Sequence, residues 1–391
     1  MDIFNLKISA NMYRILIAPN SFKGSLTADE VANAIERGLN QSKLKFQSNK
    51  FPIGDGGDHT AFLLTNHLKG DFNHYLVFGA YEDLVDACFG LTNNGKTAII
   101  EVAETSGFKT IQGETRRVLR ADTKGLGQLI DHVLSLGVCE IILCLGGSAT
   151  IDGGIGMLTA LGVRFLDAAH HIVDVYPENF SQVSSIDASA LKQKTNHCKF
   201  TVLCDVDNPL LGERGAAKVF GPQKGATEKE VILLEQFLSG FNELTIKTLG
   251  KSLDKVKFGG AAGGLSATLS VYLNADLLEG AEYFCKITGF KEALSNVDLL
   301  ITGEGSIDYQ SLNGKAPYVV AKYALGENIP VIGLAGNVPR EVTADLQQHF
   351  TMLLSIGSKP ESLLEAIDNT YENLVRTSKQ IGNILSVYNN E

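Results

Sequence analysis

Polar residues that could bind a ligand or catalyse a reaction lie where apolar segments of the sequence end. Four such places are residues 20–25, 146–150, 205–208 and 304–308, which follow the runs "ILIAP", "ILCL", "TVLC" and "LLITG". Lysine ammonium groups and backbone amides bind phosphates and carboxylates. Paired carboxylates bind Mg²⁺ or accept a proton. These residue types together indicate a site that handles an anionic substrate.

The richest of these places reads "GGSATIDGG" and spans residues 146–154, between a strand-like and a helix-like segment. Glycine lets a phosphate come close to the backbone, hydroxyls donate hydrogen bonds, and the amides at the start of a helix attract anions. We expect a phosphate site here, formed by Gly146, Gly147, Ser148, Thr150, Gly153 and Gly154. The alternative is a packing turn with Asp152 as a helix N-cap. The sequence has neither the Walker A pattern nor GxGxxG at this point.

Two lysines are candidates for holding anions. Lys23 lies in "NSFKGS", just before an expected helix, and Lys224 lies between glycines in "FGPQKGAT". A lysine at such a position acts as a point charge for a carboxylate or a phosphate. The alternative for Lys23 is a solvated loop lysine.

Carboxylates supply the second half of the expected chemistry. Asp205 and Asp207 are two residues apart and share one face of an extended segment, which suits Mg²⁺ or a general base beside a metal. Asp55 in "GDGGDH" suits a substrate hydroxyl or a metal, with an Asx-turn as the alternative. Glu304 and Asp308 in "TGEGSID" complete the set. For Asp205 and Asp207 the alternative is an aspartate-rich turn.

Composition restricts the class of protein. The chain has 391 residues and a formal net charge of −10 without a basic stripe, which argues against nucleic-acid binding. We also expect no signal peptide and no membrane span. The six cysteines show no CxxC pair, and we expect them to be buried small hydrophobes in a reducing cytosol.

Strand-like and helix-like segments alternate along the chain, which predicts an α/β fold. We expect two α/β domains: a discontinuous Rossmann- or flavodoxin-like parallel-sheet domain of residues 12–75 and 290–391, and an inserted mixed domain of residues 76–289. Residues 1–11 are expected to be an N-terminal extension. The active site is expected in the cleft between the domains, with all four polar segments at one sheet edge.

Several local elements are also predicted. Thr27 and Glu30 form a capping box for a helix over residues 26–40, and residues 74–92 have the pattern of a hairpin with its turn near residues 81–84. Residues 361–381 have the amphipathic pattern of one long helix.

Six motifs in order along the chain carry a resemblance. "IAPNSFKGSLTADEVANAIERGL", "DGG", "GGSATIDGGIGMLTALG", "CDVDNPLLGERGAAKVFGPQKGA", "GGAAGGL" and "TGEGSIDYQSLNGKAP" are similar to the motif series of the bacterial glycerate kinase family. The resemblance covers nearly the whole chain. It implies a cytoplasmic enzyme that phosphorylates D-glycerate with ATP in glycolate, glyoxylate or sugar-acid breakdown, with 2-phosphoglycerate as the favoured product.

On this hypothesis each candidate receives a role. Lys23 acts in catalysis and substrate binding, Lys224 and the 146–154 turn hold the ATP phosphates, and Mg²⁺ is held by Asp205 or Asp207. Asp308 or Asp205 accepts the proton of the acceptor hydroxyl. The other expected substrate-binding residues are Ser21, Asp55, Gly56, Gly57, Asn208 and Glu304. A monomer or a homodimer is expected.

The sequence departs from the family motifs at Asp58 and His59, where the family usually has Glu-Gly, and at Ile151, where it usually has Asn. It also has Ser306 where an arginine is usual. These departures keep two alternatives open: a kinase of another small hydroxy acid, and a non-catalytic sugar-acid-binding relative. A nucleotide-dependent oxidoreductase is disfavoured because GxGxxG does not follow the first strand.

Overall fold

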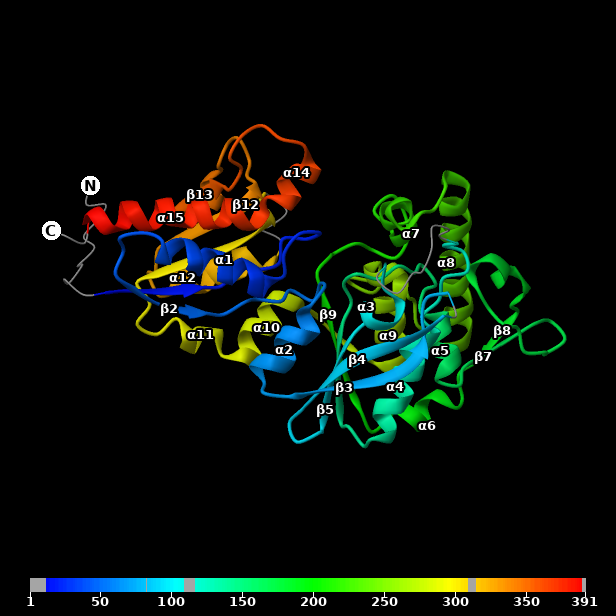
Figure 1. Ribbon diagram of the computed structural model, residues 1–391. Helices are drawn as coiled ribbons and strands as arrows, with labels where there is room; N and C mark the ends of the chain where they lie inside the picture. The colour runs from blue at the N-terminus through cyan, green and yellow to red at the C-terminus, as the bar shows by residue number, and fades with distance from the viewer. Residues whose placement is uncertain (1–11, 82, 109–116, 309–313, 389–391) are drawn as a thin grey trace. The chain divides into compact units, whose positions relative to one another are not determined.

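The computed structural model describes residues 12–81, 83–108, 117–308 and 314–388 (Figure 1). The chain divides into two compact units, the first comprising Met1–Asp55 and Ala281–Glu391 and the second Gly56–Gly280. Residues 1–11, expected to be an extension, lie outside the described residues.

The first unit contains a five-stranded parallel sheet in the order β13-β12-β11-β1-β2. From β1 the chain order runs to β2 on one side, and from β11 to β12 and β13 on the other. The strand order therefore reverses between β1 and β11, which is where ligands bind in open α/β sheets. The bounds are β1 Tyr13–Ile17, β2 Phe46–Lys50, β11 Leu299–Ser306, β12 Val331–Asn337 and β13 Met352–Ser355.

Helices cover this sheet. The predicted capping box is confirmed, since Thr27 Oγ1 accepts from the Glu30 amide and the Glu30 carboxylate accepts from the Thr27 amide at the start of α1. Helix α15 packs against α1, and Figure 1 shows the two side by side. The helices are α1 Ala28–Asn40, α10 Gly280–Thr288, α11 Phe290–Ala293, α12 Ala316–Gly326, α13 Ala344–His349, α14 Leu363–Asp368 and α15 Thr370–Tyr388.

The expectation of one long helix over residues 361–381 is wrong. The chain instead forms α14 and α15, separated at Asn369. Helix α14 buries none of its residues, whereas α15 buries Leu374 and Val375. The amphipathic pattern is continuous in sequence, but the main packing on α1 comes from α15, so the buried helix begins where that packing begins.

The second unit contains a six-stranded mixed sheet in the order β10-β9-β6-β5-β4-β3. Strands β5, β6, β9 and β10 are parallel, while β3 and β4 form the predicted antiparallel hairpin, in which Phe78 pairs with Leu84 and the Gly79 amide donates to the Asp83 carbonyl. Strands β7 and β8 form a separate pair. The bounds are β3 Asp71–Phe78, β4 Leu84–Thr92, β5 Thr97–Glu101, β6 Glu140–Cys144, β7 Arg164–Leu166, β8 Ser185–Asp187, β9 Lys199–Cys204 and β10 Asp276–Glu279.

Helix α2 and strand β3 belong to this second unit, because α2 packs against β4 and β5 and β3 pairs with β4. The limits of the two compact units thus differ from the domain boundaries predicted at residues 75/76 and 289/290. Those boundaries concern domains that fold independently, and they stay a prediction. Within the described residues, no helix is both long and apolar enough to cross a membrane. The helices are α2 Thr60–His67, α3 Ala103–Ser106, α4 Lys124–Ser135, α5 Ile155–Ala160, α6 Leu191–Thr195, α7 Ala216–Phe220, α8 Glu228–Leu249 and α9 Leu265–Leu273, with short 3₁₀ segments at Pro177–Gln182, Pro222–Lys224 and Ala261–Gly264.

The four polar segments divide between the two sheets, so the expectation of a single sheet edge is wrong. The segments at residues 20–25 and 304–308 follow β1 and β11, which are neighbours in the first unit. Those at residues 146–150 and 205–208 follow β6 and β9, which are neighbours in the second. Each pair meets at the carboxyl edge of its own sheet because its two strands are parallel and adjacent.

The cysteines follow the prediction only in part. Cys144, Cys204 and Cys285 are buried, but Cys139 is exposed, because β6 begins one residue later and Cys139 precedes the buried ladder. Burial raises the pKa of Cys198 to about 11.

Candidate active site

Asn20 organises the loop that follows β1. Its amide donates to the Gly303 carbonyl at 2.8 Å, which ties it to the neighbouring strand β11. Its Nδ2 donates to Asp55 Oδ2 at 2.7 Å, and its Oδ1 accepts from the Ser21 amide at 2.7 Å. Asn20 is buried, so it orients two predicted substrate-binding residues at once. Sequence reasoning gave Asn20 no role, although a polar residue at the end of a buried strand was the available signal.

The end of β11 lies beside this loop. A Cβ placed on Gly305 would come within 3.8 Å of the Lys23 backbone nitrogen. Glu304 is buried, and its Oε1 lies 3.9 Å from Lys315 Nζ. Lys23, Asp55, Glu304 and, as described next, Asp308 therefore share one region of the first unit.

Asp308 is linked to Ser306, one of the residues that depart from the expected motif series. Ser306 Oγ donates to Asp308 Oδ2 at 3.4 Å, and Asn337 Nδ2 donates to Ser306 Oγ at 3.2 Å. These bonds connect the ends of β11 and β12. Asn337 is a second polar residue of this region that the sequence did not single out.

In the second unit, the turn after β6 packs against the loop of residues 56–58. The Gly146 amide donates to the Gly56 carbonyl at 3.0 Å. A Cβ on Gly146 would overlap Gly57 Cα, so only glycine fits at position 146. Gly56 and Gly57, predicted to bind substrate, thus lie against the predicted phosphate turn.

Lys224 reaches this turn from the 3₁₀ turn Pro222–Lys224. Its Nζ donates to Ser148 Oγ at 3.0 Å and to the Thr150 carbonyl at 2.8 Å. Lys224 is only 5% exposed, so its charge is held in a medium of low polarity. The fold therefore brings together the lysine and the turn that the sequence had suggested for phosphate binding.

Some donors of the turn are already used and others are not. The Gly153 amide donates to the Gly263 carbonyl at 3.1 Å, and the Gly154 amide donates to Asp152 Oδ1 at 3.0 Å. Across the described residues, the amides of Gly147 and Ser148 have no acceptor. Thr150 Oγ1 is likewise buried without a hydrogen-bond partner. Ser148 and Thr150 are buried, and because buried polar groups are nearly always paired, their unused donors point to a ligand or water.

Asp152 stabilises the turn through buried hydrogen bonds. Its Oδ2 accepts from the amide and hydroxyl of Thr123, at 2.9 and 2.7 Å, and from the Gly156 amide at 3.1 Å. Burial raises the pKa of Asp152, and these donors counteract that rise. Asp152 does accept local amides, as the N-cap alternative supposed, but it also joins the turn to the start of α4.

The loop after β9 presents Asp205 and ties down Asp207. Asp205 is exposed directly after the buried strand. Asp207 Oδ1 pairs with Arg214 Nη2 at 2.8 Å, and Asn208 Nδ2 donates to the Arg214 carbonyl at 2.8 Å. Within the described ranges no group of three His, Cys, Asp or Glu side chains could cage a metal ion. An Mg²⁺ ion that arrives with a nucleotide needs only one or two carboxylates, which these residues can supply.

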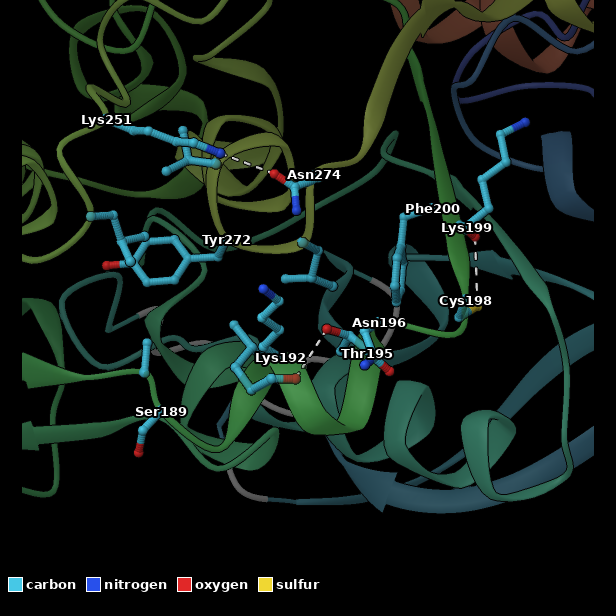
Figure 2. Close-up of a pocket in the computed structure, with 15 residues that line it drawn as sticks. Ser189, Lys192, Thr195, Asn196, Cys198, Lys199, Phe200, Lys251, Tyr272 and Asn274 are labelled. Atoms are coloured by element: carbon cyan, nitrogen blue, oxygen red, sulfur yellow. Dashed lines mark hydrogen bonds between the residues drawn. The ribbon is translucent and has the colours of Figure 1, made fainter.

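One cavity of the second unit lies elsewhere. It has a volume of about 670 Å³ and opens at the amino end of β9, away from Asp205 (Figure 2). Lys192 and Lys251 line it, and Lys251 Nζ donates to Asn274 Oδ1 at 3.0 Å. The carboxyl ends of α8 and α9 also lie there and present partial negative charge, which offsets the lysines. No residue predicted for the site lines this cavity.

Comparison with known proteins places the chain in a family. The model of the "Glycerate kinase family" matches residues 15–386. The chain is 40% identical to glycerate kinase of Bacillus subtilis, covering 94% of this chain and 96% of that protein. It is 38% identical to glycerate 2-kinase of Escherichia coli, covering 96% and 98%.

A solved structure assigned to glycerate kinase 2 of Salmonella typhimurium LT2 is also similar. It matches with a TM-score of 0.80 and 37% identity, over 97% of this chain and all of that one. The α/β fold, the ordered motifs and these similarities agree, and the chain belongs to the glycerate kinase family and is a kinase.

Proposed function

We propose that this protein transfers the γ-phosphoryl group of ATP to the 2-hydroxyl of D-glycerate and releases 2-phosphoglycerate and ADP. Family membership supports the reaction class, and the similarity to a protein named glycerate 2-kinase supports the choice of hydroxyl. Breakdown of glycolate, glyoxylate or sugar acids is the proposed setting.

The observation that carries the proposal is the buried ammonium of Lys224 on the turn of residues 146–150. Phosphoryl transfer depends mainly on positioning and on neutralising negative charge. A lysine held at low exposure beside the unsatisfied amides of Gly147 and Ser148 supplies both for the ATP phosphates. Because the amides of Gly153 and Gly154 already have acceptors, we assign phosphate binding to the first half of the turn.

The acceptor is proposed to bind in the first unit, where the strand order reverses between β1 and β11. Lys23 is the cation for the glycerate carboxylate, and Asp55, oriented by Asn20, accepts from a glycerate hydroxyl. As the oxygen–phosphorus bond forms, the acceptor hydroxyl loses its proton to Asp308 or Asp205.

Mg²⁺ is proposed as the ion that accompanies ATP and neutralises charge on its phosphates. Asp205 and Asp207 were the candidates from sequence. Asp207 pairs with Arg214 and Asp205 is exposed directly after β9, and both carboxylates stay candidates for holding this ion.

The test is an ADP-release assay with ATP, Mg²⁺ and D-glycerate, with the product identified by ³¹P NMR. L-Glycerate and tartronate serve as alternative acceptors, because Ser306 beside Asp308 departs from the motif that the resemblance implied. Turnover selective for D-glycerate with 2-phosphoglycerate as product is expected. Selective turnover of tartronate would show that the substrate is a hydroxy acid other than glycerate. Glycerate binding without turnover of any acceptor would indicate a non-catalytic relative.

A further inference from the structure

Asp58 lies directly on the proposed phosphate turn. A Cβ built on Gly147 would overlap Asp58 Oδ1 and come within 3.0 Å of Asp58 Cγ. The carboxylate therefore occupies the space beside Gly147 that only a residue without a side chain leaves open. In sequence, Asp58 is notable only because it stands where the family usually has glutamate.

The chain around Asp58 is anchored by a buried acid. Glu101, at the end of β5, accepts from the His59 amide at 2.9 Å and from the Ala61 amide at 3.2 Å. His59 has a left-handed φ of 70°, a conformation that a non-glycine residue adopts only when its surroundings enforce it. These contacts fix the backbone next to Asp58, and the fixed backbone holds the Asp58 carboxylate at the turn.

The Asp58 side chain is exposed, and its charge would be unfavourable beside a bound phosphate unless a cation joined the two groups. Lys224 and the unsatisfied amides of the turn suit a phosphate, whereas the carboxylate of Asp58 repels one. Asp58 has no cationic partner in the described part of the chain, in contrast to Asp207, which pairs with Arg214. A divalent ion bound by one carboxylate and by phosphate oxygens removes the conflict, and this is how Mg²⁺ usually binds with nucleotides.

We infer that the Asp58 carboxylate is a ligand of the Mg²⁺ ion that accompanies ATP, in addition to any contribution from Asp205. This inference rests on the proposed binding of ATP phosphates at the turn of residues 146–150. If Asp58 binds the ion, the binding of Mg²⁺ and of ATP is thermodynamically coupled. Bound Mg²⁺ strengthens the binding of ATP, and bound ATP strengthens the binding of Mg²⁺ to the same degree.

Calorimetric titration of ATP with and without Mg²⁺, in the absence of glycerate, tests the inference. Wild type, Asp58→Asn, Asp58→Glu and the control Asp71→Asn are compared; Asp71 is an exposed carboxylate on β3. The Mg²⁺-dependent gain in ATP affinity is expected to fall about tenfold or more in Asp58→Asn. ATP without Mg²⁺ is expected to bind this variant at least as tightly as wild type, because a repulsive charge is gone. Asp58→Glu and Asp71→Asn are expected to keep the gain.

Mn²⁺ gives a readout that does not involve turnover. Its electron paramagnetic resonance signal in the presence of ATP and wild-type protein is expected to change in Asp58→Asn and to be retained in Asp71→Asn. An equal Mg²⁺ effect in wild type and Asp58→Asn, with ATP binding intact, would overturn this inference alone. Failure of the wild type to bind ATP at all would overturn it together with the proposed function.

Discussion

Lys224 Nζ and Ser148 Oγ lie 3.0 Å apart although 76 residues separate them in the sequence. The same ammonium also donates to the Thr150 carbonyl, so it contacts two residues of the turn of residues 146–150. Because the lysine is buried, its charge stays concentrated there and acts on whatever the unsatisfied amides bind. This pair is the centre of the proposed phosphate site.

Replacing Lys224 by methionine is expected to weaken ATP binding by at least about tenfold, since a charge-assisted contact with phosphate is lost while side-chain volume is kept. Titration calorimetry with ATP measures the change. Lys229→Met, an exposed lysine in the first turn of α8, is the matched control and is expected to bind ATP normally. Unchanged ATP affinity in Lys224→Met would remove the lysine from the phosphate site.

Asp152→Asn is expected to destabilise the second unit by about 2–4 kcal/mol. An amide at this position turns one acceptor oxygen into a donor, and at least one hydrogen bond from Thr123, Gly154 or Gly156 is lost in a fully buried place. Calorimetric melting measures the loss. Asp167→Asn also removes an acceptor of backbone amides, but at a half-buried position, and should change melting much less. Equal effects of both variants would refute the stabilising role of Asp152.

Gly147→Ala and Gly137→Ala separate backbone strain from overlap with Asp58. Both glycines have a left-handed φ, of 70° and 79°, so each alanine is expected to cost about 1–2 kcal/mol in stability. A Cβ at Gly137 meets nothing within 4 Å, whereas at Gly147 it overlaps Asp58 Oδ1. Only Gly147→Ala is therefore expected to weaken ATP binding as well, and calorimetry on both variants checks this. Normal ATP affinity in Gly147→Ala would show that the turn is not the phosphate site.

Asn20→Ala is expected to raise the KM for D-glycerate about tenfold or more while leaving ATP affinity unchanged, because Asp55 loses the donor that orients it. Steady-state kinetics and ATP titration measure the two effects. Asn33→Ala on α1 removes an exposed amide that contacts Lys50 and serves as the control. A change in ATP affinity with a normal KM for glycerate would show that Asn20 acts at the ATP site and not at the glycerate site.

The pair of Arg14 and Asp298 is expected to make stability depend on pH. The hydrogen bond from Arg14 lowers the pKa of Asp298, with Arg14 Nε 3.0 Å from Oδ2. The stabilisation is present above the unfolded pKa of about 3.9 and is lost as pH falls through the lower folded pKa.

Asp298→Asn is therefore expected to melt below wild type at about pH 6, with the difference shrinking at about pH 3. High salt should reduce the difference at the higher pH, since the pair is partly exposed. Melting scans across this range measure it. A difference that does not vary with pH would contradict the assigned ion pair.

The sequence by itself determined the features that depend on neighbours within a few residues. The capping box of Thr27 and Glu30, the hairpin of β3 and β4, and the turn after β6 follow from local hydrogen bonding, alternation and glycine content. The ordered motifs also indicated the family that the comparisons then showed.

Only the tertiary structure decided which distant residues meet. Strand pairing placed the four polar segments on two sheets, loop packing set Asp58 against Gly147, and Arg214 engaged Asp207. The bond from Asn20 to Asp55 spans 35 residues. Such contacts depend on the register and order of strands and on how loops pack between them, and neither hydrophobic periodicity nor residue spacing encodes this within a single segment.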